Sequence, residues 1–168
     1  IDLDASNVLG EDMLGLKAST AYVPPEAIFT SLDKSCSPAS SSSAIACFKS
    51  EANRIHHGVQ FDLLHADVSY DVWSLGCVMY QMCTWGVRPL FQGGQDDNLT
   101  DLEIDYENNL WILAAWPEEV KQRKLSYVMD PNARHLLSLI LQKDPMKRPS
   151  LTRILDHPFI SLKKPVRG

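Results

Sequence analysis

The chain has 168 residues, a formal net charge of −5 and an apolar fraction of 45%, values that are ordinary for one globular domain or a large piece of one. Acidic and basic residues are interspersed, which argues against nucleic acid or an anionic membrane surface as the main partner. No apolar run approaches the roughly 18 residues that a membrane-spanning helix needs, so no membrane span is predicted.

The first part of the chain combines a loop-rich segment with a polar insert. Residues 1–29 mix short apolar steps with turn residues, and the chain opens at Ile1 without an initiator Met or a signal-peptide pattern. We therefore expect it to begin within a domain. The stretch from Ser35 to Ser43 contains six serines and predicts a mobile surface insert over about 30–66. This insert is interpreted as a solvated linker, with phosphorylation as the alternative, and His56-His57 is expected at the surface.

The segment 71–85 predicts a central core helix, because its apolar residues cover every face. Asp71 is expected at or near the start of this helix, where a carboxylate suits the unpaired amides and the helix dipole. Gly76 costs about 1 kcal/mol in a helix relative to Ala, so we expect a close packing partner at that position.

Shorter helices are predicted in the last third of the chain. A polar loop over 95–109 precedes a short helix at 110–116, and Pro117 suits the first position of the next helix. Asn132 is expected to cap a helix with an amphipathic stripe, and Ser150 to cap the last helix. The residues expected to face inward from that last helix are Leu151, Ile154 and Leu155. No convincing strand pattern appears, so the predicted fold class is mainly α with long loops.

The cysteines indicate a reducing environment. They form no C-x-x-C pair, and no nearby His completes a zinc pattern. Reduced thiols in a cytoplasmic, intracellular protein are therefore expected. The four residues are Cys36, Cys47, Cys77 and Cys83.

Three short motifs occur in a fixed order along the chain. They are Tyr22-Val23-Pro24-Pro25-Glu26, Asp71-Val72-Trp73-Ser74-Leu75-Gly76 and Asp144-Pro145-Met146-Lys147-Arg148-Pro149. With helical patterning between them, they resemble the C-terminal lobe of a eukaryotic protein kinase. The first resembles the kinase A-P-E motif with Pro24 in place of Ala, the second the start of the long central helix, and the third the loop that carries a late arginine.

The resemblance assigns structural roles to five residues. It implies an ion pair between Glu26 and Arg148 that anchors the end of the activation segment, and the planar guanidinium suits a carboxylate. It implies that Asp71 holds the catalytic-loop backbone, while a simple helix cap is the alternative. Trp73 and Gly76 belong to the same architectural motif.

The same resemblance points to the metal and to the substrate. Asp2-Leu3-Asp4 aligns with the kinase D-F-G motif, so Asp2 is the expected ligand of the magnesium that accompanies ATP. Asp4 departs from the usual Gly at that motif. The expected substrate-docking loop contains Ser19, Thr20 and Tyr22. Ser19 stands where kinases carry a hydroxyl residue, and this favours Ser/Thr over Tyr specificity. Ser6, Ser19 and Thr20 are also possible phosphorylation sites.

Other parts of the kinase signature do not occur in the 168 residues. The sequence contains no glycine-rich G-x-G-x-x-G loop, no V-A-I-K lysine and no H-R-D-L-x-x-x-N catalytic loop. We therefore expect a partial kinase domain over 1–160, which lacks the N-terminal lobe and the catalytic loop, and a tail over 161–168. Within it, 1–29 is the expected activation segment and 67–160 the helical lobe.

The expected function is that of a piece of a Ser/Thr protein kinase, inactive alone, whose parent transfers the γ-phosphoryl group of ATP to protein hydroxyls with magnesium. No catalytic residue is assigned within the chain. Its expected partners are a protein substrate and the missing N-terminal part of the domain. One alternative is a pseudokinase or scaffold, which Asp4 favours. The other is an unrelated helical interaction module, which predicts no ion pair between Glu26 and Arg148.

Overall fold

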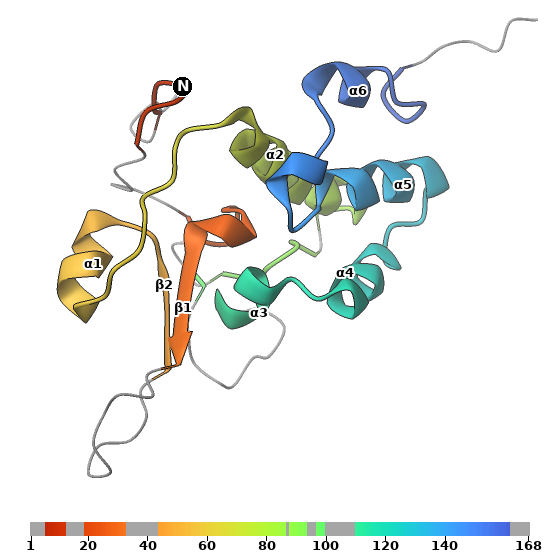
Figure 1. Cartoon of the computed structure of the whole chain (residues 1–168). Coiled ribbons are helices and arrows are strands. Elements are labelled where there is room, and N and C mark those ends of the chain that lie inside the picture. Colours follow the sequence, from red (N-terminus) through yellow and green to blue (C-terminus); the bar gives the residue numbers. More distant parts are fainter. Residues whose placement is uncertain are drawn as a thin grey trace, which may run out of the picture.

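A computed structural model of the chain describes residues 6–12, 19–32, 44–86, 88–93, 97–99 and 110–161. Figure 1 shows a group of helices beside a small two-stranded ribbon. The expectation of a mainly α-helical fold is confirmed. The elements, in chain order, are η1 (Pro25–Ala27), β1 (Ile28–Leu32), β2 (Ala44–Phe48), α1 (Glu51–His57), α2 (Val68–Cys83), α3 (Leu110–Ala115), α4 (Glu118–Leu125), α5 (Pro131–Ile140), η2 (Pro145–Lys147) and α6 (Leu151–Leu155).

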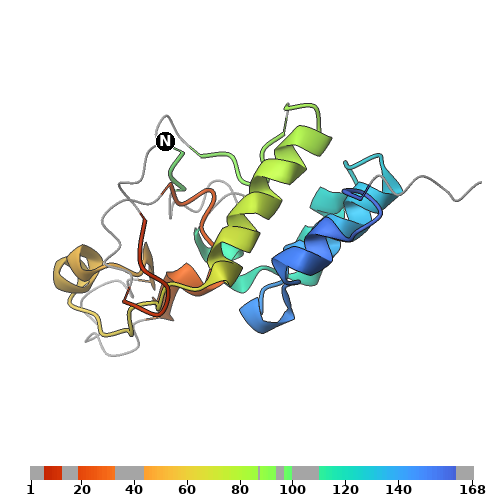
Figure 2. The ribbon, with the colours of Figure 1, turned by 90° about the horizontal axis from the view of Figure 1, so that it is seen from above.

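The centre of the helical group is α2, which packs along α5. Figure 2 shows the two helices side by side. Gly76 makes this approach possible, because a Cβ added there would lie 2.5 Å from Ile140 Cγ2 and 2.8 Å from Leu141 Cδ2. The expected close packing partner of Gly76 is therefore α5. The tyrosine hydroxyl of Tyr80 also donates a hydrogen bond to the carbonyl oxygen of Lys124, at 3.0 Å, which links α2 to α4.

The starts of two helices differ in detail from the prediction. Asp71 lies in the first turn of α2, near its start as expected, and the cap itself is Asp67, whose carboxylate accepts a hydrogen bond from the Ser69 amide at 2.8 Å. Asp130, not Asn132, caps α5, with Pro131 in the first turn. In both cases an aspartate stands at the true boundary, and the apolar pattern used to locate the boundary begins one turn later.

Not every apolar residue of α2 is covered. Val72, Trp73, Cys77 and Tyr80 are buried, as expected for a core helix. The opposite side of the helix carries exposed apolar side chains at the spacing of one helical face. They are Val68, Leu75, Val78 and Met82. The sequence pattern therefore describes a helix with two apolar sides, of which this chain covers one.

The ribbon of β1 and β2 was not predicted. The two strands pair antiparallel, from Ile28 opposite Phe48 to Leu32 opposite Ala44. Three consecutive residues of β2, Ala46 to Phe48, are buried, so both faces of this strand are covered. Alternation of polar and apolar residues cannot reveal such a strand. The ribbon packs against α3, and this tertiary contact stabilises what five-residue strands cannot stabilise alone.

The region predicted as a polar insert also contains a helix. Ser50 caps α1 by accepting a hydrogen bond from the Asn53 amide, and Gly58 ends the helix at a φ of 63°. His56 and His57 lie on α1 and are exposed, as expected. The serine-rich stretch from Ser35 to Ser43 lies outside the described residues.

The C-terminal helices agree with the sequence in position but only partly in burial. Ser150 caps α6 as predicted, since its side chain accepts from the Arg153 amide, and Ile154 is buried. The inward orientation predicted for Leu151 and Leu155 was wrong, because both are more than half exposed. None of the helices in the described part of the chain is long and apolar enough to cross a membrane.

Candidate functional site

The third motif places Arg148 at the junction of several elements. Asp144 caps η2 by accepting a hydrogen bond from the Met146 amide, and Pro145 supplies a fixed φ at the first position. This short helix ends at Arg148, whose backbone is extended. The side chain of Arg148 then runs inward and is only 1% exposed.

Every N–H of the Arg148 guanidinium has an acceptor. Its two terminal nitrogens donate to the two carboxylate oxygens of Glu26, each at 2.6 Å. The same nitrogens also donate to the carbonyl oxygens of Ser69, at 3.0 Å, and Lys143, at 3.2 Å. The remaining nitrogen, Nε, donates to the carbonyl oxygen of Gln142 at 2.9 Å. One side chain thus joins η1, the first turn of α2 and the loop after α5.

The Glu26–Arg148 pair is strongly constrained in position. The bidentate geometry uses both oxygens of a carboxylate whose side chain is 22% exposed. The guanidinium carbon also lies 5.2 Å from the ring centre of Trp73, a cation–π contact. A buried charge with five acceptors is costly to disturb, since loss of one partner leaves polar groups without hydrogen bonds. The arrangement therefore fixes the segment around Glu26 against α2.

Trp73 forms the floor beneath this pair. Its ring is fully buried and meets Trp116 edge to face, with 5.4 Å between the ring centres. Its indole Nε1 is the one buried side-chain nitrogen or oxygen in the described residues that has no hydrogen-bond partner. The packing of the ring between Arg148 and Trp116, rather than a hydrogen bond, holds it in place.

The segment before Glu26 is tied to two other regions. Thr20 is buried, and its hydroxyl oxygen accepts a hydrogen bond from the Leu99 amide at 2.6 Å. The carbonyl oxygen of Tyr22 accepts a hydrogen bond from the Ser74 hydroxyl of α2 at 3.0 Å. Ser19 is exposed. The segment is therefore fixed on its inner side while Ser19 faces outward.

Burial keeps several groups near this segment uncharged. Burial, and then the negative charge of Asp97, raise the pKa of the Tyr22 phenol. Burial, followed by the charges of Glu26 and Asp71, raises the pKa of the Tyr70 phenol. The pKa of the Cys77 thiol is also raised by burial, although Arg148 opposes the shift. These groups stay neutral at physiological pH and add no charge beside the Glu26–Arg148 pair.

Asp71 lies at the edge of a separate small cavity. It is exposed in the first turn of α2, and its carboxylate has no hydrogen-bond or ion-pair partner among the described residues. The cavity has a volume of about 210 Å³. It is lined by Ser6, Asn7, Leu9, Ala66, Asp67, Tyr70 and Asp71. A carboxylate here is free to accept hydrogen bonds from a segment that enters the cavity.

Comparisons with known proteins place this geometry in a family. Residues 63–160 match the protein kinase domain. The chain belongs to the protein kinase family. A serine/threonine-protein kinase ICK from Rattus norvegicus is 29% identical over 113 residues, which cover 57% of this chain and 17% of that kinase. A serine/threonine-protein kinase PLK4 from Danio rerio is 32% identical over 114 residues, or 68% of this chain and 9% of that kinase.

A plant relative gives the same result. The mitogen-activated protein kinase kinase kinase 9 of Arabidopsis thaliana is 30% identical over 98 residues, which cover 58% of this chain and 11% of that protein. The chain thus spans less than a fifth of the length of each of these three kinases. The matched region and the mainly helical fold agree with the C-terminal lobe of a kinase domain.

The structure joins some of the kinase residues singled out from sequence and separates others. Glu26, Arg148 and Trp73 meet at one site, and the expected ion pair is present. Thr20 and Tyr22 lie on the same segment, whereas Asp71 borders the cavity beyond it. The roles that the kinase resemblance gives these residues remain predictions.

Two contributions to the kinase site were missed from sequence. Ser74 holds the Tyr22 carbonyl, and its place in the second motif was the signal that could have indicated this. The carbonyls of Gln142 and Lys143 hold Arg148, and no sequence signal marks a backbone acceptor. Tertiary hydrogen bonds of this kind become visible only in the folded chain.

The expected metal ligand cannot be located among the described residues. Asp2, the expected magnesium ligand, and Asp4 lie outside the described residues. No group of three or more His, Cys, Asp or Glu side chains suited to a metal ion occurs in the part of the chain that the structure describes. ATP and magnesium are used by kinase domains generally, but no step through them can be derived from these residues.

Proposed function

We propose that this chain is the C-terminal-lobe part of a Ser/Thr protein kinase whose parent domain transfers the γ-phosphoryl group of ATP to serine and threonine hydroxyls. In this proposal the activation segment lies within 1–29 and the helical lobe within 67–160. The chain supplies the magnesium ligand Asp2 and the docking platform for the protein substrate, and the other residues that bind ATP come from the upstream part of the domain. Alone, the chain is inactive.

The observation that carries the proposal is the bidentate Glu26–Arg148 pair. It joins residues 122 positions apart and couples the end of the proposed activation segment to the first turn of α2. Phosphoryl transfer depends mainly on positioning and on electrostatic stabilisation, so a rigid platform for the substrate contributes directly to the rate. An anchored segment with an exposed Ser19 at its outer side suits that task.

The docking role is supported by the way Thr20 is held. Its hydroxyl oxygen accepts from the Leu99 amide and lies 3.5 Å from the Asn98 side-chain oxygen. A buried hydroxyl in this position shapes the loop and is a poor acceptor for phosphate. Of the three hydroxyls proposed as phosphorylation sites, Ser6 and Ser19 are exposed and Thr20 is not.

The exposed side of α2 supports the proposal that an upstream part of the domain binds there. Leu75, Val78 and Met82 present apolar surface next to Asp71, whose carboxylate has no partner in the described part of the chain. An apolar strip beside a free carboxylate suits a helix followed by a loop with exposed amides. We propose that the upstream part of the kinase domain covers this strip and that Asp71 orients its catalytic loop. The cytoplasmic location inferred from the cysteines remains a prediction.

Phosphoryl transfer is the direct test. The longest natural protein that contains this chain should transfer phosphate from labelled ATP with magnesium to serine and threonine peptides, and weakly or not at all to tyrosine peptides. The 168-residue chain should transfer none. Arg148→Lys keeps the charge but loses the planar fork, so we expect lower activity, whereas Arg153→Lys on the exposed surface of α6 should have no effect.

A pseudokinase is the alternative that the sequence favours through Asp4. The two functions differ in the transfer assay, because a pseudokinase would bind its protein partner but transfer no phosphate. If the longer protein is folded and transfers no phosphate to any peptide, the proposed kinase activity is wrong and a pseudokinase or scaffold function replaces it.

A further inference from the structure

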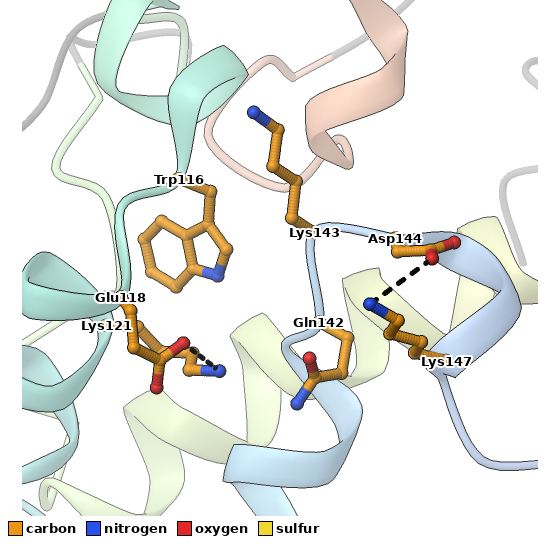
Figure 3. Close-up of a pocket in the computed structure, with 7 residues that line it drawn as sticks. All are labelled: Trp116, Glu118, Lys121, Gln142, Lys143, Asp144 and Lys147. Atoms are coloured by element: carbon orange, nitrogen blue, oxygen red, sulfur yellow. Dashed lines mark ion pairs between the residues drawn. The ribbon is translucent and has the colours of Figure 1, made fainter.

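A second cavity lies beside the loop whose carbonyl oxygens hold Arg148. It has a volume of about 420 Å³, within the usual range for small-ligand sites. It lies between α4, Trp116 and the loop that follows α5 (Figure 3). Its lining residues are Trp116, Glu118, Lys121, Gln142, Lys143, Asp144 and Lys147. Of these side chains, the anchor described above uses only Trp116, which packs on Trp73, and Asp144, which caps η2.

Three lysine side chains line this cavity. Figure 3 shows Lys121 and Lys147 on opposite sides of Gln142, while the Lys143 side chain points away from both. Two carboxylates are also present, so the formal charge of the lining is +1, from three lysines and two acids. The lining of the cavity is therefore positively charged, although the whole chain has a net charge of −5.

The two carboxylates do not neutralise the cavity evenly. Glu118 pairs with Lys121 at 2.7 Å. Asp144 lies 3.7 Å from Lys147, and its other oxygen is occupied by the Met146 amide. Lys143 has no ion-pair partner among the described residues, and its side chain is exposed. One positive charge is therefore uncompensated at the cavity and another is only loosely paired.

Burial distinguishes this cavity from a scatter of surface lysines. The Lys121 side chain is only 5% exposed, although it is charged. Lysine side chains are almost never this buried unless they are paired, as Lys121 is with Glu118. Trp116 forms a fixed wall, because its indole N–H donates to the Leu141 carbonyl at 2.9 Å. The cavity thus combines a rigid aromatic wall with charges at several points.

The wall of the cavity is also the support of the anchor. The side chains of Gln142 and Lys143 line the cavity, while their carbonyl oxygens accept hydrogen bonds from Arg148. A ligand that pulls on the Lys143 side chain acts on the same two peptide groups that hold Arg148. Occupation of the cavity is therefore coupled to the Glu26–Arg148 pair through one residue of backbone.

We propose that this cavity binds a phosphate monoester group, and that binding stiffens the Glu26–Arg148 anchor. A phosphate monoester carries a charge of about −1.5 to −2 at pH 7 and three acceptor oxygens, which match separate ammonium donors better than a single carboxylate does. Lysine binds phosphate as a point charge, without the planar geometry that arginine needs. The phosphate can belong to a small molecule or to a phosphorylated side chain of a protein.

The test uses the longest natural protein that contains this chain. Inorganic phosphate, phenyl phosphate and a phosphoserine peptide are titrated at constant ionic strength and followed by calorimetry. We expect saturable binding in the range of about 1 mM or tighter. Similar affinity for all three probes indicates a small phosphate compound, and tighter binding of the peptide indicates a phosphorylated protein. If none of the three saturates, the proposal is overturned.

Variants at exposed lysines localise the binding without risk to the core. Lys143→Gln and Lys147→Gln should each weaken binding by about fivefold to tenfold, as expected for loss of one charge-assisted contact. Arg153→Gln makes the same change in net charge on α6, outside the cavity, and should leave the affinity unchanged. Equal weakening by all three variants would show a general charge effect and would overturn the site.

Amide exchange tests the coupling separately from the binding and from kinase activity. Saturating phosphate should slow exchange of the Ala27 amide, which donates to Pro24 next to Glu26, and of the Arg148 amide. Lys143→Gln should abolish this slowing. Saturable binding with unchanged exchange at both amides would overturn the coupling. Neither readout depends on phosphoryl transfer, so failure here is distinguishable from failure of the proposed kinase function.

Discussion

The two sides of α2 have similar composition and opposite surroundings. On one side, Val72 is 2% exposed and Trp73 is fully buried beneath Arg148. On the other, Val78 is 46% and Met82 is 72% exposed. Both sides are apolar in the sequence, so the amino-acid pattern describes a helix enclosed all round. The difference teaches that the chain covers one side of its central helix and leaves the apolar side chains of the other exposed.

The side-chain hydrogen bonds that join α2 to other segments also lie on the covered side. Arg148 reaches the first turn of α2 through the Ser69 carbonyl, and Ser74 holds the Tyr22 carbonyl. On the uncovered side, Asp71 has no partner among the described residues. The covered side therefore positions the proposed substrate platform, and the uncovered side is where we propose that the upstream part of the kinase domain binds.

The largest effect should follow from removal of the anchor on the covered side. Arg148→Ala leaves Glu26 and three carbonyl oxygens without their donor, so we expect a loss of about 3–5 kcal/mol in the free energy of unfolding. Urea unfolding gives the stability, and amide exchange around Tyr22 should become faster. Arg153→Ala is the matched control and should change neither. An unchanged midpoint together with unchanged exchange would contradict the anchor.

A matched pair of valines compares the two sides directly. Val72→Ala removes buried methyl groups and should cost about 1.6 kcal/mol, at about 0.8 kcal/mol for each buried carbon group. Val78→Ala removes half-exposed groups and gains helix propensity, so we expect a change below about 0.5 kcal/mol in the 168-residue chain. Equal effects of the two substitutions on the urea midpoint would show that the sides do not differ.

A smaller effect of pH is expected at the far end of the covered side. His157 is buried, and burial followed by the charge of His135 lowers its pKa below the ordinary value of 6.5. Its Nδ1 accepts a hydrogen bond from the Phe159 amide, so the ring proton is on Nε2, which donates to His135 at 2.9 Å. The unfolded chain therefore binds a proton more readily than the folded chain, and stability should fall as pH drops below about 6.5.

The test of this pH effect is the melting temperature between pH 8 and pH 5. His135→Gln removes the neighbouring charge and should reduce the slope, while exposed His56→Gln on α1 should not. If the slope of melting temperature against pH is the same in the parent chain and in His135→Gln, His135 does not lower the pKa of His157.

The smallest effect on stability should come from charge on the uncovered side. Val78→Lys and Met82→Lys alter exposed residues, so the urea midpoint of the 168-residue chain should barely change. Binding of a hydrophobic dye should fall, because the apolar strip is interrupted. If the parent chain unfolds cooperatively and binds no dye, the strip is not an accessible apolar surface.

Much of the helical part was predictable because its signals are local. The glycine at 76, the cap at Ser150 and the stripe of α5 each follow from neighbouring residues, and the structure contains all three. The cap of α5 was misplaced by two residues, since Asp130 rather than Asn132 precedes the helix, and the cap of α2 at Asp67 was overlooked although Asp71 was correctly expected near its start. Family resemblance, rather than pattern, led to the pairing of Glu26 with Arg148.

The remaining features depend on tertiary contacts that no local pattern encodes. The ribbon of β1 and β2 is held by α3, and its buried strand shows no alternation. The acceptors of Arg148 are mostly backbone carbonyls, which every residue possesses. Leu151 and Leu155 have the spacing of a buried face but lie on a helix of five residues at the surface. Burial of a short helix is decided by its neighbours, not by its own period.

Methionine oxidation tests most directly whether an upstream part of the kinase domain covers the open side of α2. The part of the chain that the structure describes carries three exposed methionines, of which Met82 lies on that side, while Met129 and Met146 lie elsewhere at 77% and 90% exposure. Peroxide oxidation followed by mass spectrometry should modify all three rapidly in the 168-residue chain. In the longest natural protein that contains the chain, we predict that Met82 becomes at least about tenfold slower, as expected for a buried side chain, while Met129 and Met146 keep their rates. An unchanged oxidation rate at Met82 in the longer protein would show that no upstream part of the domain covers this side of α2.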